Sequence, residues 1–472
     1  MKLYNTLSRS VEEFVPLQDR QVGIYTCGPT VYNYAHVGNL KTYIMEDALV
    51  KSLEYLGYSV KRVMNVTDVG HLESDADDGE DKMLKGAARE NKTVWEVAAY
   101  YTDAFFADCA KLNIKEPTVV AKATDFIGDY IEMIRTLEAK GFTYTANGNV
   151  YFDISRFPEY TKLSRMNLED LQTASRDGVE EDLHKKNPQD FVLWFTKSKF
   201  ENQAMKWDSP WGVGYPGWHL ECSVIALKHL GPQMDIHCGG VDHIPVHHTN
   251  EIAQTESYTG KPWVKYWWHG EFLLDNSGKM SKSKGEFLTL SLLEKKGFNP
   301  LVYRFYVLGS HYRKQLVFTY ESLEMAKTAY GKLRNKVLAV KKAAEAEAGN
   351  PQRHPALAER YDQDFKNCLA DDMNISNAIT VLHEVLKEGE LSPVEKLELV
   401  RAFDTVLGLD LDKETVEEFT EEELEFIREQ IGKRAEAKKA KDFALADGIR
   451  NQLLEKGIAI EDTREGVKFK RA

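Results

Sequence analysis

The sequence has little cysteine, no long apolar run and no excess of positive charge, although it extends over 472 residues. The five cysteines form no Cys-x-x-Cys pair, and their odd number argues against a disulfide framework and for a reducing compartment. No segment approaches the roughly 18 apolar residues of a membrane span, and Glu12 and Glu13 stand where a secretory signal needs an apolar run. These absences predict a cytoplasmic protein that makes no use of a membrane.

The net formal charge of −13 gives no sign of a protein that binds nucleic acid over its whole surface. The charge is nevertheless uneven along the chain. Residues 412–430 contain nine acidic and two basic side chains, whereas residues 431–472 contain eleven basic and seven acidic ones. Any contact with a phosphate backbone is therefore expected in this C-terminal region, although a solvated helical surface would have the same charge pattern.

Apolar residues near the start of the chain predict a strand, a helix and a second strand. Residues 21–26 are rich in β-formers, apolar positions recur with helical spacing over residues 40–58, and a β-branched run occupies residues 59–66. Ligands bind at the carboxyl ends of parallel strands, and helix N-termini attract phosphate. The loop between the first strand and the helix is therefore expected to bind phosphate groups.

Two segments far apart in the sequence carry the groups that a polyphosphate transition state requires. They are residues 35–39 (AHVGN) and residues 279–283 (KMSKS). Each provides cationic or hydrogen-bond-donating side chains on a turn that contains glycine or serine. Because the chain has no P-loop, the pair predicts ATP chemistry of another kind.

The composition changes along the rest of the chain. Helical patterns at residues 94–112 and 125–140 precede mixed segments, and the chain is almost wholly helical from residue 320 to 407. A final helix is expected over residues 435–455, followed by a short strand.

These changes predict an α/β protein with three domains. The expected domains are a catalytic domain over residues 1–312, with an insertion at about 120–200 and a lysine-loop region at about 252–312, a helical bundle over 313–411, and a small mixed domain over 412–472.

Cysteine, histidine and glutamate side chains in three segments are candidate metal ligands. Cys27 follows the first predicted strand, Cys222 follows a tryptophan-rich stretch, and His247 and Glu251 are spaced to lie on one face of a helix. Two thiolates, an imidazole and a carboxylate can bind zinc tetrahedrally. The pattern alone leaves other ligands equally eligible, namely His237, Cys238, His243 and His248.

Motifs distributed over the whole chain resemble the cysteinyl-tRNA synthetases, a family of class I aminoacyl-tRNA synthetases. The segments that carry the resemblance are residues 25–32 (YTCGPTVY), 36–39 (HVGN), 216–223 (PGWHLECS), 235–237 (DIH), 247–254 (HHTNEIAQ) and 279–283 (KMSKS), with Asp242. Shorter matches from Arg434 to Asp462 resemble the terminal domain of the family. The two ATP segments specify only class I chemistry, whereas the cysteine-bearing strand and the tryptophan–cysteine segment specify this family.

The resemblance implies a Rossmann-like catalytic domain that ligates L-cysteine to its tRNA through a cysteinyl-adenylate, with release of AMP and pyrophosphate. It implies one Zn²⁺ per chain, held in the amino-acid pocket by Cys27, Cys222, His247 and Glu251, and Mg²⁺ bound with ATP. Because serine nearly matches cysteine in shape, a zinc–thiolate contact would separate the two substrates better than an apolar pocket.

The resemblance also implies roles for individual residues. His36 and Asn39 are expected to hold phosphate or ribose oxygens, and Lys282, helped by Lys279, to stabilise the leaving pyrophosphate. Asp242 is expected to bind the substrate ammonium group. The expected ATP-binding residues are His36, Gly38, Asn39, Lys279, Met280, Ser281, Lys282 and Ser283. The expected substrate-binding residues are Thr30, Trp218, His237 and Asp242.

Two positions depart from the family pattern. Asn39 stands in the first signature where the family more often has histidine, and an amide donates a hydrogen bond but cannot become cationic. His243 lies in residues 241–249 (VDHIPVHHT), where the usual pattern has phenylalanine and proline before the paired histidines. His243 is therefore an additional candidate ligand.

Three other functions are compatible with parts of the pattern. A ligase that joins cysteine to an amino sugar would share the zinc and ATP motifs but would lack residues 431–472. A metallohydrolase built on His247 and Glu251 would leave residues 279–283 unexplained, and a non-catalytic tRNA-binding protein would have no use for His36 or Lys282. The expected partners are therefore cysteine tRNA, ATP and L-cysteine, bound by a monomer.

Overall fold

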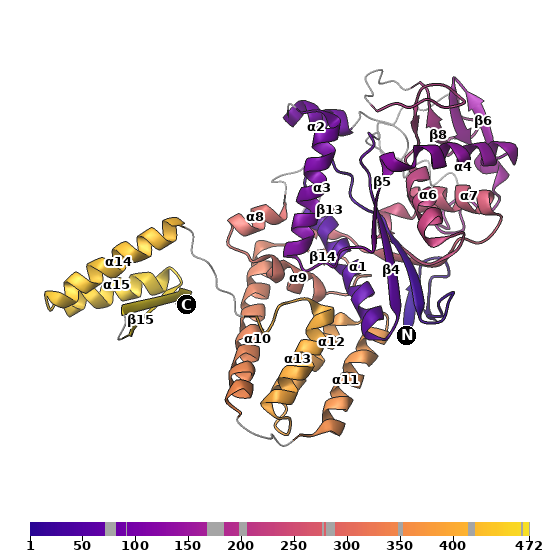
Figure 1. Cartoon of the computed structure of the whole chain (residues 1–472). Coiled ribbons are helices and arrows are strands. Elements are labelled where there is room, and N and C mark those ends of the chain that lie inside the picture. The colour runs from indigo at the N-terminus through magenta and orange to yellow at the C-terminus, as the bar shows by residue number, and fades with distance from the viewer. Residues whose placement is uncertain are drawn as a thin grey trace. The chain divides into compact units, whose positions relative to one another are not determined.

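The computed structural model describes most of the chain in two compact units, Met1–Asp412 and Lys413–Ala472 (Figure 1). Each unit has its own hydrophobic core. The residues described are 1–70, 82–90, 92–167, 184–197, 205–275, 278–279, 288–347, 353–413, 421–463 and 466–471.

A parallel sheet in the order β11-β10-β3-β4-β5 forms the centre of the first unit. Its strands are β3 (Gln21–Thr26), β4 (Ser59–Val66), β5 (Val119–Lys122), β10 (Met234–Gly240) and β11 (Val264–Gly270). Strand β3 pairs with β4 on one side and with β10 on the other. From the boundary between β3 and β10, later strands are therefore added in opposite directions, β4 and β5 on one side and β11 on the other. Parallel α/β sheets bind ligands at such a switch point, at the carboxyl ends of the strands. This sheet, with its connecting helices, confirms the predicted α/β class.

Helix α1 (Val37–Tyr55) connects β3 to β4 and is buried on almost every turn. It begins at Val37, one turn before the predicted start, because the side chain of His36 caps it. Nδ1 of His36 accepts a hydrogen bond from Gly38 N at 3.0 Å. The helix is followed by Gly57, whose φ of 89° lies in the left-handed region that favours glycine. The helix therefore ends just before this glycine, within the segment 40–58 whose apolar spacing predicts it.

Smaller sheets and helices surround the central sheet. The other strands of this unit are β1 (Lys2–Asn5), β2 (Ser10–Glu13), β6 (Thr143–Ala146), β7 (Asn149–Phe152), β8 (Phe191–Phe195), β9 (Tyr215–Pro216), β12 (Leu273–Asp275), β13 (Gly278–Lys279) and β14 (Leu316–Val317). Strands β6 to β9 form an antiparallel sheet, and helix α4 lies beside it in Figure 1.

The helices divide between the sheet and a bundle that follows it. Those around the sheets are α2 (Lys82–Glu90), α3 (Val94–Lys111), α4 (Ile127–Ala139), α6 (His219–Leu230), α7 (His247–Thr259), α8 (Leu290–Lys295) and α9 (Pro300–Leu308). The bundle consists of α10 (Tyr320–Ala346), α11 (Pro355–Ala370), α12 (Ile375–Lys387) and α13 (Pro393–Leu407) (Figure 1). Among the helices described, none is both long and apolar enough to cross a membrane.

Arg304 in α9 joins two helices beside the central sheet to the helical bundle. Its wholly buried guanidinium donates hydrogen bonds to Leu112 O at 2.9 Å, to Leu407 O, and to Asp47 Oδ2 at 2.7 Å. Burial opposes ionisation of Asp47, but the charges of Arg304 and Lys51 keep the pKa of its carboxyl below the ordinary value. One side chain therefore connects α1, the end of α3 and the end of α13.

The second unit packs two helices against a hairpin. The elements are α14 (Glu421–Lys439), α15 (Phe443–Glu455), β15 (Ile458–Thr463) and β16 (Gly466–Arg471). The predicted single helix over residues 435–455 is wrong, because Lys441 has a φ of 60° and the side chain of Asp442 accepts a hydrogen bond from Leu445 N at 3.0 Å. Asp442 therefore starts a new helix. A bidentate ion pair of 2.8 and 2.9 Å joins Arg434 in α14 to Asp462 in β15.

Replacing Arg304 by methionine should destabilise the first unit strongly. The substitution leaves Asp47 buried without its main cationic partner, and breaking a buried pair in this way typically costs about 3–5 kcal/mol of unfolding free energy. We expect a clear shift of the urea unfolding transition at neutral pH.

The matched control is Arg353→Met. Arg353 pairs with Glu398 at the surface, where both side chains are about half exposed, so the transition should stay at the wild-type position. Equal transitions for the two variants would show that the buried junction does not hold the unit together.

Candidate active site

Side chains from three elements meet at the switch point of the sheet. Cys27 directly follows β3, Cys222 lies in the first turn of α6, and His247 and Glu251 lie one turn apart in α7. Their potential ligand atoms all lie within 4.8 Å of one another, and the four side chains are largely buried. The structure therefore brings together the four residues that the resemblance implied as zinc ligands.

The separations within this set fit a tetrahedral zinc ion. Cys27 Sγ lies 3.8 Å from Cys222 Sγ, which lies 3.5 Å from His247 Nε2. With bonds of about 2.3 Å to sulfur and about 2.0 Å to nitrogen, tetrahedral geometry gives about 3.8 and about 3.5 Å for these two separations. Glu251 Oε1 lies 2.9 Å from His247 Nε2 but makes no hydrogen bond within the described part of the chain. A buried carboxylate oxygen in this position is available to a cation.

A second set of side chains shares two of these ligands. Cys27 and Glu251 also lie close to His237 and His248. Cys27 Sγ is 3.6 Å from His248 Nε2, and Glu251 Oε2 is 2.8 Å from His237 Nε2. The two sets compete for the same thiol and carboxylate. The first set has two sulfur ligands, which suit zinc better than one.

Burial and neighbouring charges set the protonation states in the pocket. Burial would raise the pKa of Glu251, but the charges of His237 and His247 lower it to about 2. Burial, together with the contact to Cys222, raises the pKa of the Cys27 thiol well above its ordinary value. Binding of a metal ion would displace the thiol proton. The site thus presents the Glu251 carboxylate and a Cys27 thiol that a bound cation would convert to a thiolate.

Aromatic rings and further histidines form the walls of the pocket. The Trp218 ring lies 5.0 Å from the His247 ring, and the His237 ring stacks on Trp267 at 4.8 Å. The His243 ring lies 5.1 Å from His247, yet His243 belongs to neither ligand set among the described residues.

The other predicted substrate-binding residues lie on loops at the same edge of the sheet. Asp242 lies in a short 3-10 helix (Val241–His243) that directly follows β10. Thr30 forms an isolated parallel bridge with Thr67, the residue after β4. The other two predicted substrate residues contact the ligand set directly. Trp218, just before α6, lies against His247, and His237 in β10 lies against Glu251.

A polar network that the sequence did not reveal fixes the loop after Cys27. Glu221 Oε1 accepts hydrogen bonds from Asn65 Nδ2 at 2.7 Å and from Thr67 Oγ1 at 2.8 Å. Asn65 Oδ1 in turn accepts from Gly28 N at 2.7 Å. A Cβ atom at Gly28 would lie 1.6 Å from Asn65 O, so no larger residue fits there. In the sequence, the only indication that Glu221 helps to position this loop was its place next to the candidate ligand Cys222.

A second relay of polar groups extends away from Cys27. His248 Nδ1 and His269 Nε2 are 2.8 Å apart, and His269 Nδ1 and Thr6 Oγ1 are also 2.8 Å apart. His248 and His269 are wholly or almost wholly buried, so these contacts fix the ring of His248 against the ligand set. No pattern in the sequence pointed to His269, which lies in β11.

The first ATP segment lies against the chain that follows the second. Val37 N donates a hydrogen bond to Leu288 O at 2.9 Å, and His36 forms an isolated bridge with Thr289. Asn39 is exposed at the start of α1. Lys279 lies in β13, opposite Leu274 of β12.

The remaining predicted ATP-binding residues, Met280, Ser281, Lys282 and Ser283, lie outside the described part of the chain.

Comparison with known proteins identifies the family. The model of the tRNA synthetases class I (C) catalytic domain matches residues 13–328. Cysteine–tRNA ligases from Treponema denticola and Borrelia turicatae are 48% and 45% identical to this chain, and each alignment covers 100% of this chain and 99% of the relative.

Solved structures share the fold at lower identity. Mycobacterium tuberculosis methionyl-tRNA synthetase in complex with methionyl-adenylate has a TM-score of 0.58 at 15% identity, over 83% of this chain and 92% of that chain. The agnB2 LeuRS–tRNA–LeuAMS ternary complex from Agrobacterium radiobacter K84 has a TM-score of 0.57 at 10% identity, over 84% of each chain. These likenesses support the class I synthetase fold, and the full-length sequence matches show that the chain belongs to the cysteine–tRNA ligase family of class I aminoacyl-tRNA synthetases.

Proposed function

We propose that this protein ligates L-cysteine to its tRNA through a cysteinyl-adenylate. The observation that carries the proposal is the convergence of Cys27, Cys222, His247 and Glu251 at the switch point of a class I sheet. In the first step, the cysteine carboxylate attacks the α-phosphorus of ATP and pyrophosphate leaves. In the second step, the 2′-hydroxyl of the terminal adenosine of tRNA attacks the carbonyl carbon of the adenylate, and AMP leaves.

The residues around the start of α1 would stabilise the charge that develops on the phosphates. His36 and Asn39 would contact phosphate or ribose oxygens, and the N-terminus of α1 adds a favourable dipole. Lys282, assisted by Lys279, would neutralise the leaving pyrophosphate, and Mg²⁺ would accompany ATP. The hydrogen bond between Val37 N and Leu288 O supports this arrangement, because it joins the first predicted ATP segment to the chain that follows the second.

The thiol and imidazole cluster would select the substrate. A Zn²⁺ ion held by Cys27, Cys222, His247 and Glu251 would act as a Lewis acid that binds the substrate thiolate in preference to a serine hydroxyl. Trp218 and His237 would enclose the substrate side chain, and Asp242 would bind its ammonium group. Thr30 would contribute to the same pocket from the loop after β3.

Replacing Cys222 by serine should remove both zinc and selectivity. A hydroxyl is a much poorer zinc ligand than a thiolate, so we expect far less than one zinc ion per chain after dialysis. Discrimination of cysteine against serine in ATP–pyrophosphate exchange should fall by at least about tenfold. Metal content is measured by mass spectrometry and discrimination by the ratio of kcat/KM values.

Two further variants make this experiment discriminating. Cys109→Ser changes a buried cysteine outside both ligand sets and should keep its zinc. His248→Asn alters only the second set and should also keep it. Normal zinc content in Cys222→Ser, with loss in His248→Asn, would assign the ion to the second set and contradict the proposal.

Replacing Lys282 by alanine should slow adenylate formation. Loss of one charged group that stabilises the transition state typically costs about 100-fold or more in kcat. The KM for cysteine should change by less than about threefold, because the proposed partner of Lys282 is the pyrophosphate and not the amino acid. ATP–pyrophosphate exchange measures both constants.

The control for Lys282 is Lys327→Ala, which removes an exposed lysine that donates to Gly297 O at 3.1 Å. This variant should behave as wild type. A Lys282→Ala variant whose defect lay mainly in cysteine affinity would contradict the assigned role.

Removing residues 413–472 should separate the two steps. This segment forms a unit with its own core and contains the basic region of the chain. We expect tRNA charging to fall by more than about tenfold, because contacts with phosphates are lost. Cysteine-dependent ATP–pyrophosphate exchange should stay near the wild-type rate. Equal losses in the two assays would show that the unit does not serve tRNA binding.

A further inference from the structure

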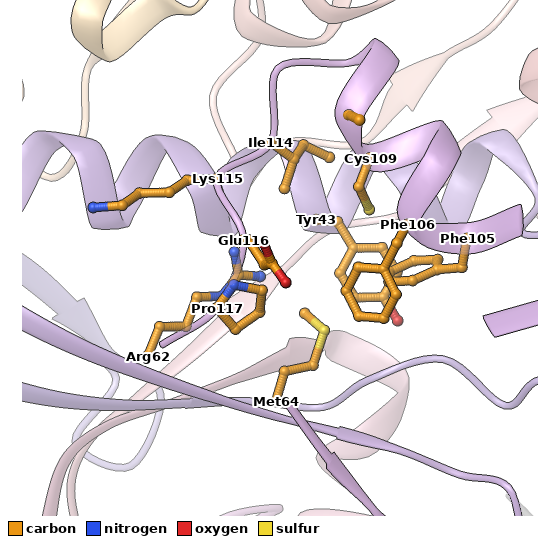
Figure 2. Close-up of a pocket in the computed structure, with 11 residues that line it drawn as sticks. Tyr43, Arg62, Met64, Phe105, Phe106, Cys109, Ile114, Lys115, Glu116 and Pro117 are labelled. Carbon is orange, nitrogen blue, oxygen red and sulfur yellow. The ribbon is translucent and has the colours of Figure 1, made fainter. Parts of the chain in front are cut away.

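Lys41 is a basic residue in the interior of the first unit. It lies in the second turn of α1 and is 1% exposed. Two residues further along the helix, Tyr43 lines a largely apolar cavity together with Phe105 and Cys109 of α3 (Figure 2). Lysine is almost never fully buried unless a partner satisfies its ammonium group. The contacts of Lys41 therefore indicate its role.

The ammonium group of Lys41 has one hydrogen-bond partner among the described residues, the main-chain carbonyl of Glu271. The distance from Nζ to this oxygen is 2.5 Å. Burial lowers the pKa of Lys41 to about 8, although the charge of Glu271 opposes this shift. A buried amine with a carbonyl as its partner stabilises a fold less than an apolar side chain of similar size would. Stability alone therefore does not account for a lysine at this position.

Glu271 lies in the turn between β11 and β12. Its N donates a hydrogen bond to Tyr312 O at 2.8 Å, and its O accepts the bond from Lys41. Both backbone groups of Glu271 are therefore held by residues outside the turn. Strand β12 begins two residues later, at Leu273. The start of this strand is thus fixed relative to α1.

Strands β12 and β13 form an arm that leads to the second ATP segment. Strand β13 pairs antiparallel with β12 and ends at Lys279, from which residues 280–283 continue directly. The arm also passes close to the first turn of α1, because a Cβ atom at Gly38 would lie 3.8 Å from Cβ of Leu273. Lys41 therefore joins the helix of the first ATP segment to the arm that carries the second.

We propose that Lys41 is a positioning residue for Lys282. The hydrogen bond from Lys41 to Glu271 sets the spacing between α1 and the arm, and thereby the place where Lys282 meets the phosphates of ATP. This inference rests on the proposed adenylation, in which α1 and Lys282 act on the same polyphosphate. Groups that act on a transition state have to be held within a fraction of an ångström by the residues behind them. That requirement accounts for a polar contact in an interior where packing favours an apolar side chain.

Replacing Lys41 by methionine tests this role. Methionine keeps most of the volume without the donor, so the thermal unfolding transition should stay near the wild-type temperature or rise. The kcat of cysteine-dependent ATP–pyrophosphate exchange should nevertheless fall by at least about tenfold, because a misplaced catalytic group costs that much or more. The KM for cysteine should change by less than about threefold, and zinc content should match that of the wild type, because Glu271 belongs to neither ligand set.

The matched control is Lys51→Met, the same substitution in the same helix. Lys51 lies about 15 Å further along α1, where it donates to Asn113 O at 2.6 Å and pairs with Asp47 at 2.8 Å. This variant should lose stability and keep the wild-type exchange rate. A folded Lys41→Met variant with wild-type kcat, or one whose rate falls only together with its stability and zinc content, would overturn the proposal.

A double-mutant cycle identifies the group through which Lys41 acts. In a Lys282→Ala background, Lys41→Met should lower kcat by less than about threefold, because the group that it positions is already absent. Equal reductions in the two backgrounds would show that Lys41 acts elsewhere.

Hydrogen exchange gives a reading that does not depend on activity. Peptides that cover β12 and β13 should lose protection in Lys41→Met and not in Lys51→Met; unchanged protection would contradict the proposal. If Lys41→Met does not fold, Lys41→Gln, whose amide is one atom shorter than the lysine, replaces it in each comparison. A wild-type protein without cysteine-dependent exchange would refute the proposed function, whereas an active wild type with an equally active Lys41→Met variant would refute only the role of Lys41.

Discussion

Cys27, Cys222, His247 and Glu251 lie where water is largely excluded, and ionisable groups in such places are unfavourable unless they have partners. The surrounding structure supplies those partners in layers. His237 and His247 balance the Glu251 carboxylate, Trp218 and Trp267 cover the imidazoles, and α7 is buried along most of its length. A cation bound among the four groups would complete this balance, which is why the zinc proposal agrees with the architecture around the site.

Local patterns in the sequence were sufficient to predict the two strands next to the site. The predicted strands at residues 21–26 and 59–66 coincide with β3 and β4. The β-forming residues there are not accompanied by a helical pattern that would compete with a strand. The start of α1 was missed because histidine is an unusual N-cap. The break between α14 and α15 was missed because lysine does not signal the left-handed conformation that Lys441 adopts, although Asp442 is a favoured residue type for the start of a helix.

Contacts between residues far apart in the sequence were harder to infer. The sulfur atoms of Cys27 and Cys222 lie 3.8 Å apart although the two residues are 195 positions apart in the chain. Only the family resemblance selected this pair from the sequence.

The comparisons favour a cysteine–tRNA ligase over the other functions that the sequence left open. The curated relatives match the chain over its whole length, including the C-terminal unit that a cysteine–amino-sugar ligase would lack. A metallohydrolase would not require the class I catalytic domain that matches residues 13–328. The network of Glu221, Asn65 and Gly28 also favours a synthetase, because it rigidly positions the loop between a candidate zinc ligand and the ATP segment.

The contact between Val37 and Leu288 couples the backbones that flank the two predicted ATP segments. Val37 N belongs to the first residue of α1, and its acceptor, Leu288 O, lies in the chain that follows residues 279–283. His36 also forms a bridge with Thr289, so the start of α1 is attached to this chain at two neighbouring positions. A substitution that moved the backbone at residues 288–289 would therefore also move the N-terminus of α1, although it would change none of the predicted ATP-binding residues.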